Sequence, residues 1–339
     1  MVKKALLLVN LGSPDSCEVR DVKSYLDEFL MDEKVIDIPY LFRYLLVKGI
    51  IVPFRSPKSA AKYKSIWTDK GSPLVQITKE LTSLVREHMG IPVYMCMRYA
   101  NPAPGVVLSK IKEEHPHLEE LVVLPLYPHF AMSSYETALD HVRMAYQRNN
   151  YSFRLSVVSP FYNHPDYISA LGASIIPYLK SEYDHVLFSY HGIPERHVKK
   201  SDPTGSHCLN CENCCELPSK AHDFCYRHQI KETTKRVAEY LHLPVNKHSF
   251  SFQSRLGNNK WLKPYTIEFF KDFPLKGIKK LVVVCPAFVS DCLETLEEIN
   301  MEGRKLFMES GGESFEMVPC LNTNSEWVKT ISVLVNNTN

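Results

Sequence analysis

The chain has 339 residues, more than one hydrophobic core usually holds, so its length favours two domains of ordinary size. Its 40 basic and 38 acidic side chains leave a formal net charge of +2, which argues against a broad nucleic-acid-binding surface and predicts no nucleic-acid partner. With 45% apolar and 23% charged residues the chain is typical of a folded globular protein, and no apolar stretch approaches the roughly 20 residues that cross a bilayer.

The first apolar run, Ala5–Val9, is too short for a signal peptide and predicts a buried strand in a cytoplasmic protein. Similar short runs recur, each followed by a turn and a stretch of helical period. Strands are expected at Ala5–Val9, Val93–Met97, Glu120–Leu126, Phe153–Val158, His185–Ser189, Ser249–Phe252, Lys280–Cys285 and Phe315–Val318. Helices are expected at Glu18–Met31, Leu74–His88, Val106–Glu114, Tyr135–Gln147, Pro165–Lys180, Gln229–Leu241, Pro264–Lys271, Cys292–Met308 and Ser325–Leu334. Such alternation predicts βαβ units and parallel sheets that helices cover on both faces.

Four of the predicted strands fall in each half of the chain, with a seam near Ser159–Phe161. We therefore predict two similar α/β domains, residues 1–160 and 161–339, each a four-stranded parallel sheet flanked by helices. The last helix is a candidate to pack back on the first domain. The sequence does not address the oligomeric state.

The carboxyl ends of the predicted strands carry prolines, aromatic residues and single polar groups. Ligands of open parallel sheets bind in the crevice outside these ends. The segments concerned are Asn10–Pro14, Arg98–Pro102, Pro125–His129, Ser189–Pro194, Gln253–Arg255 and Cys285–Asp291. Proline and glycine also punctuate ordinary turns, but six such loops together favour an aromatic, weakly charged cleft that suits a large flat organic ligand.

His191 directly follows an apolar strand, in Ser-Tyr-His-Gly-Ile-Pro. A histidine at such a strand end can act as a general base or a metal ligand, because its unperturbed pKa lies near neutrality. A lone histidine is more often structural, so this signal is weak when taken alone.

Four acidic residues, Asp291, Glu294, Glu298 and Glu302, recur at spacings of three and four, which would place them on one face of an α-helix. A solvated surface face would show the same pattern. The row begins, however, just after a predicted strand, where the cleft is expected. A hard, partly hydrated divalent cation could pass along it.

A cluster of cysteines lies in the loop at about residues 201–228. Its members are Cys208, Cys211, Cys214, Cys215 and Cys225. Thiolates spaced this closely indicate a metal site, because disulfides are rare in a reducing cytoplasm. Four of the five would ligate an iron–sulfur cluster, which we favour, or zinc, and His207, His222 and His228 keep a mixed zinc site open.

The segment Ile38–Arg55 mixes large apolar residues with Arg43, Lys48, Arg55 and the nearby Lys58. Such a segment can lie in a membrane interface with its basic groups at lipid headgroups. A buried helix whose Arg and Lys side chains reach the surface is the alternative.

Ser189–Pro194 together with Phe288–Leu296 resembles the ferrochelatase family. Agreement extends along nearly the whole chain. In chain order it includes Asn10–Pro14, Met97–Pro102, Leu124–Pro128, Gln253–Arg255 and Trp261–Pro264. The resemblance implies two Rossmann-like domains of a chelatase-like fold and insertion of Fe²⁺ into protoporphyrin IX, the last step of protohaem synthesis.

The resemblance also implies roles for single residues. His191 and Glu294 match the family's invariant pair, which would meet the substrate iron, with Asp291 beside them and Glu298 and Glu302 as a metal relay behind. Positions that line the porphyrin pocket match Leu11, Arg98, Tyr99, Tyr127, Trp261 and Phe288. Leu11 stands where coproporphyrin-using relatives carry a tyrosine, so protoporphyrin is the expected substrate.

The resemblance also has implications for residues 32–58, for the cysteine loop and for Cys292. Residues 32–58 match the apolar lip through which the family meets the membrane, which implies a location at the inner face of the cell membrane. Some members carry a [2Fe–2S] cluster, and here its ligands are inferred from cysteine spacing. Cys292 replaces the histidine of animal forms, so a ligand role at that position is not expected.

Metal insertion requires the pyrrole protons to leave and the iron to shed water. Neutral His191 could accept the protons, while Glu294 and the row behind it deliver hydrated Fe²⁺ or carry protons away. Phe288, Trp261 and Tyr127 would hold a bent macrocycle. The alternatives are a chelatase for cobalt or nickel with sirohydrochlorin, and a non-enzymatic iron–sulfur redox sensor or haem carrier.

Overall fold

The computed structural model describes residues 2–255 and 260–338. The chain divides into two compact units. The first contains the residues up to Leu126, Met132–Ser159 and the C-terminal segment from Thr323, and the second contains Tyr127–Ala131 and Pro160–Asn322. The last helix thus belongs to the first unit, and a short piece of the first half belongs to the second.

The first unit is built on a parallel sheet. Its strands are β1 (Lys4–Asn10), β2 (Val93–Met97), β3 (Glu120–Pro125) and β4 (Arg154–Val157), in the order β2-β1-β3-β4. Every neighbouring pair is parallel. Ala5–Val9 is fully buried, as expected for a central strand that is covered on both faces.

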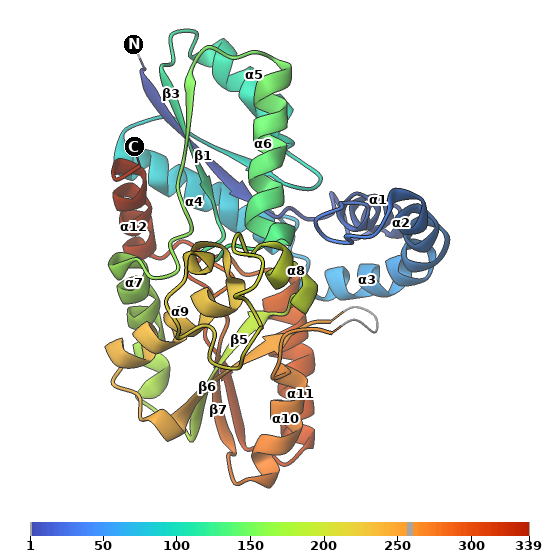
Figure 1. Cartoon of the computed structure of the whole chain (residues 1–339), viewed down its shortest axis with the longest axis vertical. Coiled ribbons are helices and arrows are strands. Elements are labelled where there is room, and N and C mark those ends of the chain that lie inside the picture. The colour runs from blue at the N-terminus through green and yellow to red at the C-terminus, as the bar shows by residue number, and fades with distance from the viewer. Residues whose placement is uncertain (1, 256–259, 339) are drawn as a thin grey trace. The chain divides into compact units, whose positions relative to one another are not determined.

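Helices connect these strands as right-handed crossovers require. α4 (Pro73–Met89) precedes the edge strand β2. α5 (Pro104–Glu114) connects β2 to β3 on the other side of β1, and α6 (Thr137–Arg148) connects β3 to β4. α12 (Ser325–Asn336) packs against α4 (Figure 1). The C-terminal helix therefore completes the layer on one face of the first sheet.

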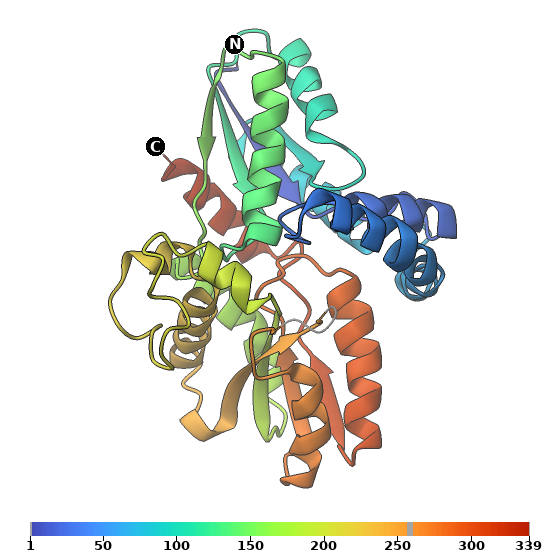
Figure 2. The ribbon, with the colours of Figure 1, turned by 45° about the vertical axis from the view of Figure 1, so that its right-hand side comes forward.

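The second unit repeats this topology. Its strands are β5 (His185–His191), β6 (His248–Gln253), β7 (Lys280–Val284) and β8 (Ser314–Met317), all parallel, in the order β6-β5-β7-β8. α7 (Pro165–Ile175) packs against α9 (Tyr226–Tyr240), and α10 (Thr266–Leu275) packs against α11 (Arg304–Glu309) (Figure 2). The predicted fold class, two four-stranded parallel sheets flanked by helices, is confirmed.

The remaining helical elements complete the described part of the chain. They are α1 (Val19–Leu30), α2 (Tyr40–Leu46), η1 (Val47–Ile51), α3 (Val52–Ile66), η2 (Met132–Glu136), η3 (Ile176–Leu179), α8 (Glu195–Lys200), η4 (Lys220–Phe224), η5 (Val245–Lys247) and η6 (Glu294–Gly303). Two regions of the chain differ clearly from expectation. α2, η1 and α3 form a helical segment that the sequence reading left without assignment, and η6 is a π-helix where an α-helix was expected.

A buried histidine gives the second unit a predictable pH response. Burial lowers the pKa of His129 from 6.5 to about 3, and its Nε2 lies 2.9 Å from the hydroxyl of Thr233. The unfolded chain therefore binds a proton below pH 6.5 that the folded chain does not bind until about pH 3.

The stability that His129 contributes is complete above its unfolded pKa and falls as the pH drops from that value towards its folded pKa. We expect this residue alone to lower the free energy of unfolding by about 2 kcal/mol between pH 7 and pH 5. His129→Gln, which stays neutral, should flatten that part of the curve. Urea titrations at both pH values measure the free energy of unfolding. An equal decrease between pH 7 and pH 5 in both proteins would contradict the prediction.

Candidate active site

His191 is the last residue of β5, the strand between β6 and β7. The connections from β5 to β6 and from β6 to β7 run in opposite directions, so the sheet has its topological switch point beside β5. Open α/β sheets bind ligands outside the carboxyl ends of the strands at such a point. The imidazole is half-buried, and its Nδ1 lies 2.7 Å from the carbonyl oxygen of Gly192.

The contact with Gly192 decides which nitrogen of His191 is basic. A carbonyl oxygen only accepts, so Nδ1 must carry a hydrogen and donate it. In the neutral ring, Nε2 then holds the lone pair. His191 can therefore take up a proton or contact a metal through Nε2 while Nδ1 keeps the ring in place.

Gln253 connects the end of β5 with the start of η6. Its carbonyl oxygen accepts the Gly192 N–H at 2.7 Å, and its side-chain Nε2 donates to the carbonyl of Glu294 at 3.1 Å. Its Oε1 accepts the Ser189 hydroxyl at 2.8 Å, and the whole side chain is buried. One glutamine thus fixes the backbone at both His191 and Glu294.

The backbone at Gly192 leaves no room for a side chain. A Cβ there would lie 2.9 Å from the Ser254 carbonyl oxygen and 3.0 Å from that of Gln253, and the Trp261 ring would be 3.4 Å away. Both oxygens belong to the backbone, so they cannot move aside cheaply. The glycine of the Ser-Tyr-His-Gly-Ile-Pro segment therefore allows the end of β6 to pack directly against the turn that carries His191.

Glu294 is half-buried, and the thiol of Cys292 donates a hydrogen bond to its carboxylate. Burial, and then the negative charge of Glu294, raise the pKa of Cys292 well above its usual value of 9. The thiol remains protonated, and a thiol is not a metal ligand. Cys292 therefore supports the carboxylate of Glu294.

The acidic row continues along η6. The i→i+5 hydrogen bonds of a π-helix widen each turn, so Glu294, Glu298 and Glu302 remain close to one face even though the expected helix type was wrong. The hydroxyl of Ser254 donates to Oε2 of Glu298 at 2.6 Å. Glu294 and Glu298 are half-buried and Glu302 is exposed, so the row leads from the strand ends towards solvent.

Asp291 differs from the other members of the row, because its carboxylate is buried and fully engaged. Oδ1 accepts the Thr295 hydroxyl at 2.9 Å, and Oδ2 accepts the side-chain amide of Asn322 at 2.6 Å. The backbone N–H of Asp291 donates to Asn322 at 2.8 Å. These bonds anchor the start of η6, and the catalytic role expected for Asp291 stays a prediction.

Two of the expected porphyrin-lining residues lie beside His191. The ring centroid of Phe288, which follows β7, is 6.3 Å from that of the imidazole. Trp261 pairs with Pro194 in an isolated bridge and lies against Gly192. Tyr127, which is half-buried, belongs to the same unit. The second unit therefore places one aromatic ring against the imidazole of His191 and another against the turn that follows it.

The three other expected lining residues meet in the first unit. The N–H groups of Arg98 and Tyr99 donate to the carbonyls of Asn10 and Leu11 at 2.8 and 2.9 Å, so all lie where β1 and β2 end. Leu11 is half-buried and open to a ligand, whereas the Tyr99 side chain is fully buried and donates to Asp32 at 2.7 Å.

Arg98 is also committed to Asp32. Its Nη2 lies 2.5 Å from Oδ2 of Asp32, and its Nε donates to Thr137 at 2.7 Å. Burial acts to raise the pKa of Asp32, but hydrogen bonds from Thr137, the Lys34 backbone and Tyr99, with the Arg98 charge, hold it below 3.8. Arg98 and Tyr99 therefore hold in place the strand end that carries Leu11.

A family model described as Ferrochelatase matches residues 3–339. The chain is 47% identical to a ferrochelatase of Opitutus terrae, with 97% of this chain and 95% of that protein covered. It is 45% identical to a ferrochelatase of Pseudomonas syringae, with 98% of each covered. The chain belongs to the ferrochelatase family. It is accordingly a lyase that inserts Fe²⁺ into protoporphyrin in haem synthesis, and this expectation is confirmed over its alternatives.

Solved structures show the same fold outside the ferrochelatase family. SirB from Bacillus subtilis with Fe³⁺ aligns with a TM-score of 0.56 at 12% identity, and the alignment covers 99% of this chain and 97% of the SirB chain. A sirohydrochlorin chelatase SirB in complex with cobalt gives a TM-score of 0.55, also at 12% identity. At this level of identity the likeness concerns architecture alone.

The cysteine loop of this ferrochelatase-family chain lies in the second unit, ahead of α9 (Figure 2). Cys208, Cys214, Cys215 and Cys225 are buried, whereas Cys211 is exposed. The thiol of Cys225 is hydrogen-bonded to those of Cys208 and Cys215. Within the described residues, no three His, Cys, Asp or Glu side chains stand in the arrangement of a single metal site.

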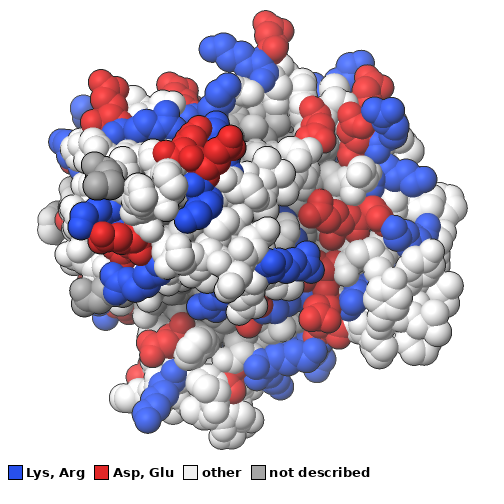
Figure 3. All heavy atoms as spheres, turned by 90° about the horizontal axis from the view of Figure 1, so that it is seen from above, with Lys and Arg blue, Asp and Glu red and all other residues white. Residues whose placement is uncertain are grey.

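The expected lip of the family is helical. Val47, Val52 and Tyr63 are buried, but seven large apolar side chains on α2, η1 and α3 are exposed, with Phe54 at 75%, so the alternative of an entirely buried helix is wrong. The seven exposed side chains are those of Tyr40, Leu41, Phe42, Tyr44, Leu45, Ile50 and Phe54. Figure 3 shows a largely uncharged area over this part of the first unit. None of the helices in the described ranges has the length and hydropathy of a membrane span.

The basic residues of the lip are placed differently from expectation. Arg43 is buried and donates to the carbonyls of Ile36 and Ile38 at 3.2 and 3.0 Å. Lys48 pairs with Asp27. Only Arg55 and Lys58 of the expected set are exposed without a recorded ion pair in the described part of the chain.

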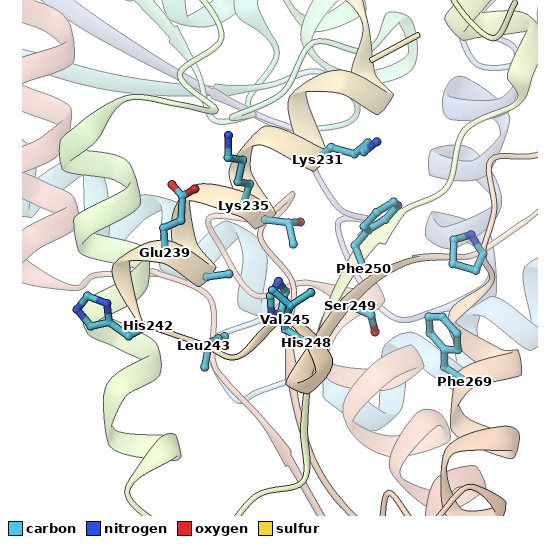
Figure 4. Close-up of a pocket in the computed structure, with 13 residues that line it drawn as sticks. Lys231, Lys235, Glu239, His242, Leu243, Val245, His248, Ser249, Phe250 and Phe269 are labelled. Carbon is cyan, nitrogen blue, oxygen red and sulfur yellow. The ribbon is translucent and has the colours of Figure 1, made fainter. Parts of the chain in front are cut away.

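A groove of about 980 Å³ lies elsewhere on the second unit. Lys235 and Glu239 of α9 line one side, and Phe250 of β6 and Phe269 of α10 line the other (Figure 4). It borders the start of β6, whereas His191 lies at the opposite, carboxyl end of the sheet. The groove is therefore separate from the candidate active site.

Proposed function

We propose that His191 is the base and Glu294 the iron-side carboxylate of Fe²⁺ insertion into protoporphyrin IX. The observation that carries this proposal is the pair of contacts made by Gln253, which fixes the backbone of both residues at one strand end. Neither residue needs to travel to meet a ligand held there. Fixed geometry of this kind lets a base act without a reorganisation step.

Proton removal would fall to Nε2 of His191. As that nitrogen accepts a pyrrole proton, the ring becomes an imidazolium, and its Nδ1–H bond to Gly192 becomes charge-assisted and stronger. Phe288 and Trp261 would hold the macrocycle against the imidazole. Rings packed on two sides can favour a bent tetrapyrrole, which exposes the nitrogen lone pairs.

Iron would arrive on the side of Glu294. The exposed Glu302 meets hydrated Fe²⁺ first, Glu298 follows, and Glu294 delivers it, because hard oxygen ligands bind such an ion weakly enough to release it. Asp291 would keep the start of η6 in place. In the first unit, Leu11 would contact the porphyrin, with Arg98 and Tyr99 behind it. In the second unit, Tyr127 is the residue expected to contact the porphyrin.

Anaerobic assays with two porphyrins test the substrate. We expect the purified chain to convert protoporphyrin with Fe²⁺ to haem, followed by the loss of porphyrin fluorescence. Coproporphyrin should react poorly because Leu11 stands where its users carry tyrosine. Faster turnover of coproporphyrin, or of sirohydrochlorin with Co²⁺, would contradict the proposed specificity.

We also propose that the cysteine loop binds a [2Fe–2S] cluster, which some members of the family contain. The buried thiol of Cys225 contacts those of Cys208 and Cys215, and the sulfur of Cys214 accepts a hydrogen bond from the Leu209 N–H at 3.4 Å. We assign Cys208, Cys215 and Cys225 as three ligands, with Cys211 or Cys214 as the fourth. A bound cluster would supply one-electron redox chemistry and would cross-link the loop.

Iron and acid-labile sulfide measured on the anaerobically purified protein, with its visible spectrum, test the cluster. Cys208→Ser should abolish the signal, and Cys17→Ser, outside the loop, should preserve it. Cys211→Ser and Cys214→Ser then identify the fourth ligand, because only one of them should lose the cluster. Stoichiometric zinc without sulfide would contradict the assignment.

We further propose that the lip binds a membrane surface from the cytoplasmic side. Exposed aromatic and aliphatic side chains on α2, η1 and α3 would enter the interface, with Arg55 and Lys58 near anionic headgroups. An apolar product would then leave into lipid.

Sedimentation with vesicles containing phosphatidylglycerol measures this binding. Changing both Phe42 and Phe54 to Ser should weaken it about tenfold, since two partly inserted rings lose their transfer free energy. Val106→Ser, which alters an exposed apolar residue on α5, is the matched control. Equal binding by both variants would remove the lip from membrane contact.

A further inference from the structure

The backbone of His191 has a carbonyl group that the sheet does not satisfy. The next residue, Gly192, turns its N–H to Gln253 of β6, so His191, one residue earlier, points its carbonyl away from β6. On that side β7 pairs with β5 only as far as Phe188. A buried carbonyl at a strand end needs another donor.

Tyr226, the first residue of α9, supplies that donor. Its hydroxyl lies 2.8 Å from the carbonyl oxygen of His191, and its side chain is 5% exposed. The ring packs edge-on to His129, with centroids 6.0 Å apart. The peptide between His191 and Gly192 is thus held by Tyr226 at its C=O and by Gln253 at its N–H.

The position of Tyr226 depends in turn on the cysteine loop. Cys225 is the N-cap of α9, and its sulfur accepts the His228 N–H at 3.5 Å. The thiol of Cys225 also contacts those of Cys208 and Cys215, and the imidazole of His228 lies 2.8 Å from the Cys215 carbonyl. The residue next to Tyr226 is therefore part of the cysteine cluster.

We propose that Tyr226 is a positioning residue for His191 and that the conformation of the cysteine loop determines where the Tyr226 side chain lies. This inference rests on the proposed role of His191 as the base. Without the Tyr226 hydroxyl, the 191–192 peptide loses one of its two anchors, and Gly192 has no side chain to resist its rotation. The Nδ1 bond to the Gly192 carbonyl then no longer fixes one orientation of the imidazole.

Kinetics with Tyr226→Phe test the positioning role. We expect kcat for iron insertion to fall about tenfold, part of what a base contributes, while the KM for protoporphyrin stays within about twofold. Tyr240→Phe is the matched control, because it removes a hydroxyl from the exposed far end of the same helix. A Tyr226→Phe protein with the kcat of the control would overturn the inference.

The ¹⁵N spectrum of the histidine side chains provides a readout that does not depend on turnover. The chain has 14 histidines, and His191→Ala identifies the signals of interest by their absence. We expect the Nδ1-protonated form to dominate in the wild type and in Tyr240→Phe, and a mixture of tautomers in Tyr226→Phe. Unchanged signals in Tyr226→Phe would contradict positioning.

The link to the loop is tested with Cys208→Ser, or with Cys215→Ser if that protein does not fold. The change should shift the His191 signals in the wild-type background and leave them unaltered when Tyr226 is already Phe. Equal shifts in both backgrounds would show that the loop does not act through Tyr226. If His191→Ala keeps full turnover, the proposed base fails instead, and the spectra still decide the position of the imidazole.

Discussion

Replacing His191 by Ala should lower kcat for iron insertion by about 10³-fold while leaving the KM for protoporphyrin within about threefold. The substitution removes Nε2, the lone pair that the Gly192 contact leaves free. It leaves the aromatic rings of Phe288 and Trp261, which would hold the macrocycle. Stopped anaerobic assays with Fe²⁺, read by haem absorbance, measure both constants.

His191→Asn separates basicity from position in that experiment. The asparagine amide can still donate to the Gly192 carbonyl, but it offers no basic nitrogen. Its kcat should therefore be as low as that of His191→Ala. Thermal melting checks that both variants remain folded. If the asparagine protein recovers most of the activity, His191 orients a ligand and another group removes the protons.

Much of the fold could be read from sequence because its central strands, β1, β3, β5 and β7, are buried on both faces. Continuous apolar runs such as Ala5–Val9 have no other stable place in a protein of this size. The helical segment from Tyr40 to Ile66 was not assigned, because it combines two different faces. Val52, Ala60 and Tyr63 belong to a buried face of α3, which also includes Ser56 and Ser59. Large apolar residues elsewhere on the segment are exposed, so hydrophobicity does not mark the core-facing stripe on which periodicity arguments depend.

The π-helix η6 shows a second limit. Spacings of three and four residues suit an α-helix, and Glu294, Glu298 and Glu302 also stay together in the wider turn. Side-chain periodicity therefore located the face correctly and could not distinguish the two backbone hydrogen-bonding patterns. The difference in helix type affects only how the acidic residues follow one another along η6. Glu294 still begins the row beside the strand ends.

His191 and the acidic row could be found because strand ends of parallel sheets converge. Gln253, Tyr226 and Ser254 were missed as functional residues. Gln253 and Tyr226 act through backbone carbonyls, which carry no side-chain signature in a sequence. A signal existed for Gln253 and Ser254, since both belong to the segment Gln253–Arg255 that follows a predicted strand. Tyr226 could not have been paired with His191 before the start of α9 was known.

Changing Glu294 to Gln should lower kcat for iron insertion by about 10²-fold. The amide keeps the size of the side chain, and Gln253 still binds the backbone carbonyl at this position, so the site should keep its shape. What disappears is the negative charge that draws a hydrated cation from Glu298. The apparent KM for Fe²⁺ should therefore rise as well, while protoporphyrin binding, measured by fluorescence quenching, stays unchanged.

The effect of a substitution on kcat should depend on its position along the acidic row, and this dependence tests the direction of iron delivery. Glu302→Gln, at the exposed end, should raise the KM for Fe²⁺ with little change in kcat, because it acts before the chemical step. Glu309→Gln, an exposed residue of α11 outside the row, is the control for general loss of charge. If Glu302→Gln lowers kcat as strongly as Glu294→Gln, the carboxylates act as one proton path, and iron reaches the porphyrin from elsewhere.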